Sequence, residues 1–133
     1  MLIQAVPYGH DTSNPPVKVT PTWPSAEVEG LAVSACADCH SNATRWPAYA
    51  RIAPGSWLIR RDVDEGRSRL DWSEPCGELE DLRSIITSGE MPPLQYRLIH
   101  TDARLSAAER RTLADGLEAA LTPLHMGECA GGD

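Results

Sequence analysis

Residues 36–40 read Cys36-Ala37-Asp38-Cys39-His40, and the interpretation of the whole chain starts from this pentapeptide. Its spacing is that of a c-type haem attachment sequence. Two thiols one helical turn apart can each add to a vinyl group of one porphyrin, and His40 then supplies the proximal imidazole ligand to the iron. The pentapeptide therefore predicts one covalent haem c, attached through Cys36 and Cys39 and ligated by His40.

Two other interpretations of the pentapeptide are open. Cys36, Cys39 and His40 could belong to a zinc site completed by Cys76 or Cys129, although adjacent Cys39 and His40 depart from the usual two-pair ligand spacing. A thioredoxin-like redox pair would need a strand leading into the motif and a βαβ context. The residues before Cys36 have a helical pattern instead, so haem attachment is the favoured interpretation.

Length and composition suit a small cofactor-binding domain. The 133 residues suffice for one domain with a modest core. Phenylalanine is absent and aromatic residues make up only 5% of the chain, so a bound apolar cofactor would add surface that the core lacks. The net charge of −7, without any block of lysine or arginine, argues against binding to nucleic acid or to an anionic membrane surface.

The hydrophobic periodicity predicts an all-α chain without a convincing strand. Ser25 is a predicted N-cap, and apolar residues at helical spacing continue to Cys39, so one helix would carry both cysteines at its C-terminal end. Ser106 and Glu109 form a predicted capping box for the last helix, which Pro123 ends. Two further helices are predicted in between, over residues 56–70 with Ser56 as N-cap and over residues 78–88.

Three segments are expected along the chain. Residues 1–24 contain five prolines and should form an extended N-terminal arm. Residues 25–122 should form the haem-binding domain, and residues 123–133 a Gly-rich C-terminal tail.

The second axial ligand is predicted to be Met91. It lies far beyond His40 in the segment Gly89-Glu90-Met91-Pro92-Pro93, whose two prolines stiffen a loop that would hold a weak thioether ligand against the iron. Methionine is otherwise a common core residue, so this prediction depends on the haem motif upstream. His100 is an alternative sixth ligand that would give bis-histidine ligation, and Met126 is a weaker one.

Longer stretches around these residues show a family resemblance. The segment Cys36-x-x-Cys39-His40-Ser41-Asn42-x-Thr44-x-Trp46-Pro47-x-Tyr49 is much more specific than the haem motif alone. Further matching stretches lie at residues 7–9, 14–17, 52–58, 62–67, 89–96, 100 and 103–106. On these residues the chain resembles the haem-binding domain family of single-haem bacterial c-type cytochromes.

The resemblance implies a cytochrome c-like helical fold and an exported protein, often tethered in this family by an N-terminal membrane segment. The side chains expected to pack around the porphyrin are Trp46, Tyr49, Ile52, Trp57 and Pro92. The arginines considered as partners of the haem propionates are Arg45, Arg51, Arg60 and Arg61. The chain departs from the family pattern at Ala48, where the family tends to carry an aromatic residue, and at Cys76 and Cys129, which are additional.

The predicted function is outer-sphere transfer of one electron to or from a redox protein. Ligation by His40 and Met91 would fill both axial positions, so no substrate would reach the iron, and we expect an electron carrier rather than an enzyme. The alternatives are a haem-based sensor or enzyme with a displaceable sixth ligand, and a structural zinc module. Fast carbon monoxide binding would favour the first alternative, and a missing Soret band the second.

A periplasmic or other exported location is expected, with a redox protein as partner. The chain begins without a basic n-region and contains no apolar run of about 18 residues. We therefore expect a mature or trimmed form, whose precursor would carry the export signal or membrane tether.

Cys76 and Cys129 are expected to form a disulfide. An exported protein matures in an oxidising compartment, where two cysteines outside the haem motif tend to pair. The alternatives are two unpaired thiols or a bridge between chains through Cys129, because the sequence alone does not fix connectivity.

Covalent attachment through Cys36 and Cys39 predicts that acid–acetone extraction leaves the colour with the protein. The denatured mass should exceed the chain mass by one haem. Complete transfer of the haem into the acetone would refute covalent attachment.

Overall fold

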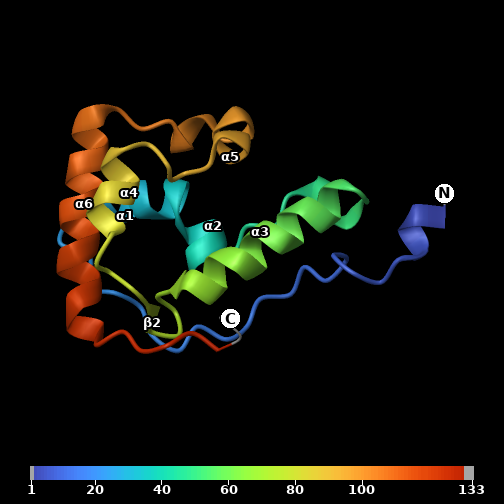
Figure 1. Ribbon diagram of the computed structural model, residues 1–133, viewed down its shortest axis with the longest axis horizontal. Coiled ribbons are helices and arrows are strands. Elements are labelled where there is room, and N and C mark those ends of the chain that lie inside the picture. Colours follow the sequence, from blue (N-terminus) through green and yellow to red (C-terminus); the bar gives the residue numbers. More distant parts are fainter. Residues whose placement is uncertain (1, 131–133) are drawn as a thin grey trace.

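The computed structural model describes residues 2–130, and helices dominate this part of the chain. The α-helices, shown in Figure 1, are α1 (Ala26–Ala35), α2 (Ala37–His40), α3 (Gly55–Arg69), α4 (Leu82–Thr87), α5 (Leu94–Ile99) and α6 (Ala107–Leu121). The 3-10 helices are η1 (Leu2–Ala5), η2 (Ala48–Arg51), η3 (Thr101–Ala103) and η4 (Thr122–Leu124), and the two-residue strands β1 (Leu70–Asp71) and β2 (Cys76–Gly77) pair antiparallel. The prediction of an all-α chain is confirmed in part, because the structure is mostly helical but also contains the short pair β1–β2. Met1 of the predicted arm and residues 131–133 of the predicted tail lie outside the described residues.

Helices α1 and α6 begin at the predicted caps. The Ser25 side chain accepts a hydrogen bond from the Val28 N–H at 3.1 Å. At α6, the Ser106 hydroxyl accepts from the Glu109 N–H and the Glu109 carboxylate accepts from the Ser106 N–H, which completes the capping box. These contacts satisfy backbone donors that the first turn of a helix leaves without partners.

The helix expected from Ser25 to Cys39 is interrupted, and this part of the prediction is wrong. Cys36 leaves helical geometry at φ −129°, so α1 ends at Ala35 and Cys39 lies in the separate helix α2. The two helices pack on different neighbours, α1 on α6 and α2 on α3. One straight helix could not pack on both α6 and α3. The break at Cys36 therefore turns the motif towards α3.

The middle of the chain departs from the prediction in four places. Helix α3 matches the predicted 56–70 closely, but Pro54 takes the N-cap position and Ser56 is buried in the first turn. Helix α4 begins at Leu82 instead of residue 78, because the chain first has to leave β2 through Gly77, whose φ is +119°. The sequence pattern predicts neither the short pair β1–β2 nor α5, which has no buried residue and so gives no amphipathic signal.

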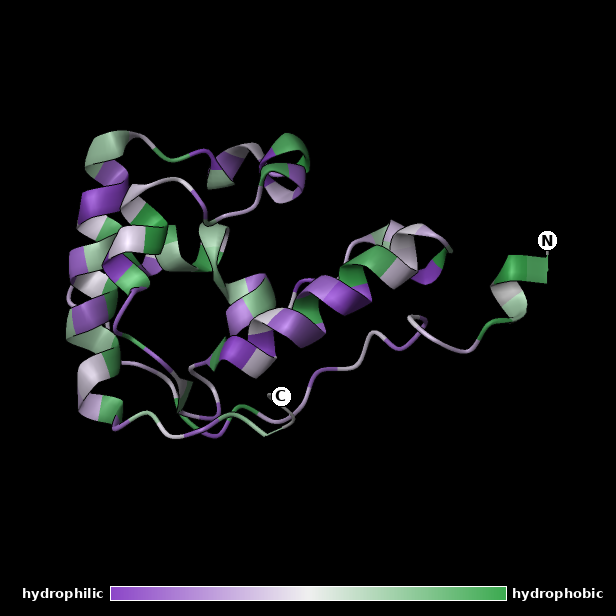
Figure 2. Cartoon of the chain, viewed as in Figure 1, coloured by the Kyte–Doolittle hydropathy of each residue, from purple (hydrophilic) through white to green (hydrophobic). Residues whose placement is uncertain are grey.

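The core lies where α6 packs against α1 and α4. Gly116 of α6 meets Val28 of α1 so closely that a Cβ at position 116 would collide with the valine side chain. Figure 2 shows hydrophilic and hydrophobic residues interleaved along α6, as expected for a helix with one buried face. The fully buried side chains of this region include Ala32, Leu113, Ala114, Leu117 and Leu121. No helix within residues 2–130 is long and apolar enough to cross a lipid bilayer.

Residues 10–23 contain no helix or strand and run along the body towards α1 (Figure 1). Hydrogen bonds hold this segment in place. The Asn42 side chain donates to the Pro16 carbonyl at 3.0 Å, and the Lys18 and Val19 N–H groups both donate to the Ser73 carbonyl at 3.0 Å. Asn14 accepts from the Trp46 indole N–H at 2.9 Å.

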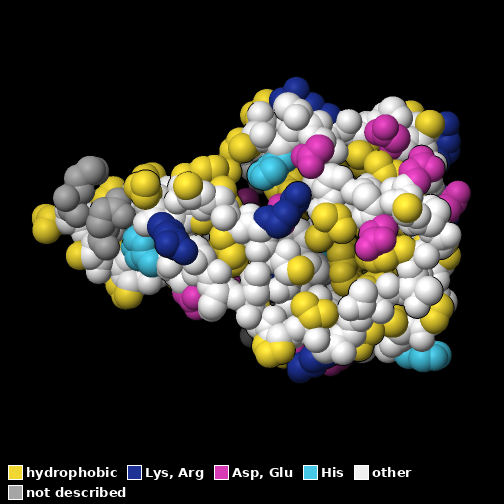
Figure 3. Space-filling view, turned by 180° about the vertical axis from the view of Figure 1, so that it is seen from behind, with side chains coloured by type: hydrophobic (Ala, Val, Ile, Leu, Met, Phe, Trp, Pro, Cys, Tyr) yellow, Lys and Arg dark blue, Asp and Glu magenta, His cyan; other side chains and the backbone are white. Residues whose placement is uncertain are grey.

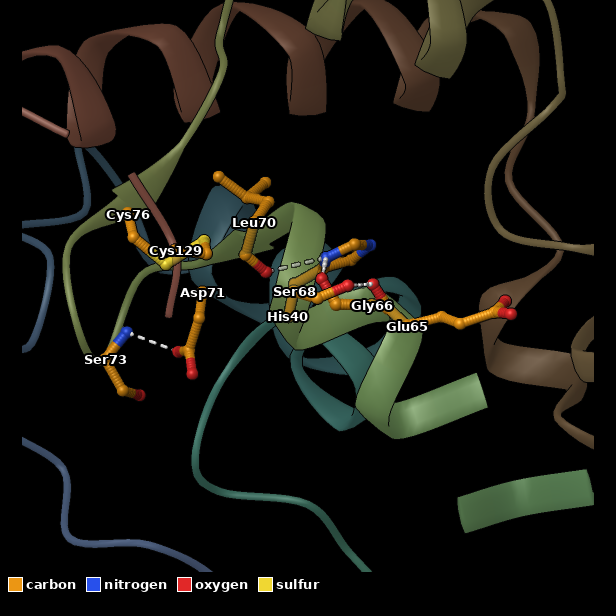
Figure 4. The surroundings of a disulfide bond; sticks show 9 residues. All are labelled: His40, Glu65, Gly66, Ser68, Leu70, Asp71, Ser73, Cys76 and Cys129. Atoms are coloured by element: carbon orange, nitrogen blue, oxygen red, sulfur yellow. Dashed lines mark hydrogen bonds between the residues drawn. A yellow bond between two sulfur atoms is a disulfide. The ribbon is translucent and has the colours of Figure 1, made fainter. Parts of the chain in front are cut away.

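A disulfide joins Cys76 of β2 to Cys129 near the C-terminus (Figure 4). Backbone hydrogen bonds accompany it, since the Gly77 N–H donates to the Gly127 carbonyl at 2.8 Å and the Gly127 N–H donates to the Pro75 carbonyl at 3.0 Å. The residues before Cys129 therefore run beside β2 and stay attached to the body of the protein.

Replacement of both Cys76 and Cys129 by alanine should lower the free energy of unfolding by about 2–4 kcal/mol, because the bridge closes a loop spanning a sequence separation of 53. Denaturant unfolding of the variant and the parent measures the difference. Thiol titration of the denatured, unreduced parent is the control and should find no thiol at these positions. An unchanged unfolding midpoint would contradict the prediction.

Candidate functional site

The two cysteines of the motif lie at the junction of α1 and α2. Cys36 is the joint residue, Cys39 is in α2, and both are half-buried free thiols. Burial raises the pKa of both thiols to about 12, with a smaller contribution from the neighbouring Cys39 at Cys36 and from Asp38 at Cys39. Both sulfurs are therefore uncharged at neutral pH, which suits an apolar environment.

The His40 ring is fixed by its Nδ1 atom. Nδ1 lies 2.9 Å from the Leu70 carbonyl and 3.1 Å from the Gly66 carbonyl, and because both are acceptors, Nδ1 must carry the proton. Burial lowers the pKa of His40 below its usual value, so the ring is neutral at pH 7. Figure 4 shows the second ring nitrogen pointing away from Leu70 and Gly66. Among residues 2–130, Nε2 has no hydrogen-bond partner, which leaves its lone pair available to a metal.

His40 lines a large cavity between α3 and the pair α4 and α6. Its volume is about 1020 Å³, at the upper end of the roughly 300–1,000 Å³ typical of small-molecule and cofactor sites. Cys36 and Met91 line the same cavity, whereas Cys39 is not among its lining residues. The apolar part of the wall consists of Leu70, Trp72, Leu82, Ile85, Ile86 and Leu117. The charged lining residues are Glu65, Glu78, Asp81, Glu90, Glu128 and Arg69.

These residues fit a haem. A neutral imidazole with an available Nε2, an apolar wall and a thioether occur together around one cavity of suitable volume. The fit is a property of the described side chains and does not depend on the spacing of the motif alone.

The two candidate sixth ligands have different surroundings. Met91 lines the cavity and is 38% exposed. His100 is not a lining residue; its ring stacks on Tyr96 with the centroids 4.0 Å apart, and its Nδ1 lies 3.2 Å from the Tyr96 carbonyl. The geometry therefore favours Met91 over His100.

The side chains predicted to pack around the porphyrin lie elsewhere in this structure. Trp46, Tyr49, Ile52 and Trp57 surround η2 and the first turn of α3, whereas α3 contributes to the cavity only through residues near its C-terminal end. Tyr49 and Ile52 are exposed, and Figure 3 shows apolar side chains gathered on this narrow end of the molecule. Pro92 is buried but does not line the cavity.

The arginines considered as propionate partners are also absent from the cavity wall. Three of them form ion pairs instead, Arg45 with Asp38, Arg60 with Asp64 and Arg61 with Asp62. Arg69 is the arginine that lines the cavity within the described residues, and the sequence pattern does not distinguish it from the others.

A buried carboxylate inside the motif is a feature that the sequence analysis misses. Asp38 is only 6% exposed and accepts hydrogen bonds from the Tyr96 hydroxyl at 2.7 Å and from the Arg45 N–H at 2.9 Å. Burial, followed by the hydrogen bond to Asp38, raises the pKa of Tyr96 above its usual value, so the hydroxyl stays a donor. This contact ties α2 to α5, the helix that follows Met91.

The disulfide makes two of the candidate zinc ligands, Cys76 and Cys129, unavailable to a metal. Cys76 and Cys129 are bonded to each other and cannot complete a zinc site with Cys36, Cys39 and His40. The thioredoxin-like interpretation also loses support, because helix α1 precedes the motif where that interpretation needs a strand.

Gly66 allows α3 to approach α2 at the motif. A Cβ at this position would lie 2.7 Å from the Cβ of Cys39, and the Gly66 carbonyl also accepts the hydrogen bond from His40. A glycine inside a predicted helix is the sequence signal for such an approach.

Gly66→Ala should therefore destabilise the protein by about 1–3 kcal/mol, because α3 must move away from Cys39. Gly30→Ala is the matched control, since nothing lies within 4 Å of a Cβ there, and it should stabilise α1 by roughly 0.5–1 kcal/mol. Denaturant unfolding of both variants tests the difference. Equal stability of the two variants would contradict the close approach at Gly66.

Comparison with known proteins places the chain in a family. Neither the curated proteins nor the solved structures gave a match. The family model of the haem-binding domain matches residues 1–119, a range that includes the Cys36–His40 motif and Met91. This match covers most of the chain and confirms the resemblance seen in the sequence. The chain belongs to the haem-binding domain family.

Proposed function

We propose that the protein is a single-haem c-type cytochrome that transfers one electron at a time in the periplasm or another exported compartment. The observation that carries this proposal is the His40 ring, which lines the cavity with Nδ1 bound to backbone carbonyls and Nε2 available. Met91 lines the same cavity, and its thioether would be the second ligand of the haem iron. Haem binding itself follows from membership of the family.

Cys36 and Cys39 attach the haem covalently. Each thiol adds across a vinyl group, so that a carbon–sulfur bond forms while the thiol hydrogen passes to the other vinyl carbon, and no oxidant is consumed. Cys36 already lines the cavity. Cys39 directly precedes His40 in α2, so attachment at this residue anchors the ligand helix.

The residues around the cavity tune the transfer of the electron. The bound haem supplies the one-electron couple between ferric and ferrous iron. The hydrogen bonds from Nδ1 orient the His40 ring and increase the basicity of Nε2. The Met91 thioether favours the reduced state and raises the potential. The apolar wall formed by residues such as Leu82 and Leu117 limits access of water.

With His40 and Met91 both holding the iron, no substrate would reach it, so the protein would act as an electron carrier rather than an enzyme. Its partner is another redox protein. The disulfide between Cys76 and Cys129 supports an exported location, because such bonds persist in oxidising compartments.

Redox titration of the purified holoprotein, followed in the visible spectrum, should give a single one-electron transition. A pyridine haemochrome spectrum should identify haem c. A protein that binds carbon monoxide quickly and stoichiometrically when reduced would instead be a sensor or enzyme with a displaceable ligand.

Met91→Ala should abolish the weak far-red charge-transfer band of the oxidised protein and lower its reduction potential, because the thioether is then lost. His100→Ala is the matched control and should keep the band, since His100 stacks on Tyr96 away from the cavity wall. A band that survives in Met91→Ala would show that the Met91 assignment is wrong, and a parent protein without the band would favour bis-histidine ligation through His100.

A further inference from the structure

Arg110 of α6 is a buried cation that the proposed electron transfer does not use. The residue is 8% exposed, and its Nη1 atom donates to the Ile86 carbonyl and to the Met91 carbonyl, each at 2.9 Å. Among residues 2–130, no carboxylate forms an ion pair with it. Burying a guanidinium for two neutral acceptors is costly, so the contact calls for an explanation beyond general packing.

The two carbonyls belong to the two ends of one loop. Ile86 lies in the last turn of α4, and Met91 follows after a turn in which Gly89 adopts φ +88°. A Cβ at Gly89 would lie 4.0 Å from the Cζ atom of Arg110, so the loop passes close to the guanidinium. The Met91 N–H also donates to the Ile85 carbonyl, at 3.3 Å. The backbone of Met91 is thus held on both sides of its Cα, by α4 and by α6.

Such a hold matters because a thioether is a weak, neutral iron ligand. Charge does not attract its sulfur to the metal, so the position of the backbone decides whether the sulfur stays within bonding distance. Hydrogen bonds from a charged donor are stronger than those between neutral groups, and Arg110 places one on the Met91 carbonyl itself.

We propose that Arg110 is the positioning residue for the sixth ligand, holding the Met91 loop so that the thioether remains on the iron. This inference rests on the proposed function, in which Met91 ligates the haem. It gives Arg110 a role that a purely structural contact between α4 and α6 would not have.

The test compares Arg110→Met with Arg83→Met in the holoprotein. Arg83 also links α4 to α6, through Asp115 and Glu118, but makes no contact with Met91. At equal haem content, Arg110→Met should lose most of the far-red band and bind carbon monoxide faster than the parent, while Arg83→Met should match the parent in both. If Arg110→Met keeps the band and resists carbon monoxide like the parent, the inference is wrong.

A second variant covers the case in which Arg110→Met does not fold. Arg110→Lys keeps the charge but loses the fork of donors, so it should weaken the hold on the loop. On heating, the far-red band of this variant should disappear well before the far-UV circular dichroism changes, with a wider gap than in the parent. A gap no wider than that of the parent would indicate a purely structural residue and overturn the inference.

The Met91→Ala variant separates failure of the inference from failure of the proposed function. If Met91→Ala keeps the far-red band, Met91 is not the ligand and both ideas fall. If Met91→Ala loses the band while both Arg110 variants keep it, the proposed function stands and only the role of Arg110 is overturned.

Discussion

The pair of hydrogen bonds from Nδ1 of His40 to the Gly66 and Leu70 carbonyls is the constraint on which the rest of the site depends. It leaves a single ring nitrogen for a metal and fixes where that nitrogen lies. Gly66 belongs to the last turn of α3, and its carbonyl accepts from the Leu70 N–H as well as from His40. Leu70 begins β1, which turns the chain at the point where the second carbonyl is needed. The contact between His40 and the two carbonyls therefore depends on three features. These are the end of α3, the missing side chain at Gly66 and the break at Cys36.

The wall of the cavity that contains Met91 is held in place by contacts between residues far apart in the sequence. Met91 depends on α4 and α6, and α5 beyond it is tied to the motif through Tyr96 and Asp38. Carboxylates outnumber the single arginine among the lining residues, and negative charge near a metal centre favours its oxidised state. In the proposed haem complex, the acidic lining and the thioether of Met91 would thus act on the reduction potential in opposite directions.

Local signals in the sequence predict much of this structure. The caps at Ser25 and Ser106 and the extent of α3 are short-range features, and they are found almost where the pattern puts them. The break at Cys36 escapes prediction because it arises from the different packing partners of α1 and α2, not from a residue that disfavours helix. Helix α5 escapes because exposed Leu94, Leu98 and Ile99 give no periodic burial. At the site, the motif indicates His40 and the prolines indicate Met91, but the partners of both side chains, such as the Leu70 carbonyl and Arg110, come from distant parts of the chain.

Part of the cavity wall comes from C-terminal residues that lie beyond the range matched by the family model. The match ends at residue 119, within α6, yet Gly127, Glu128 and Cys129 line the cavity and are fastened there by the bond to Cys76. A fragment cut at the end of the matched range would retain His40 and Met91 and still lack part of the wall around them. In this chain, the natural unit for expression and for binding measurements is therefore longer than the unit that sequence comparison recognises.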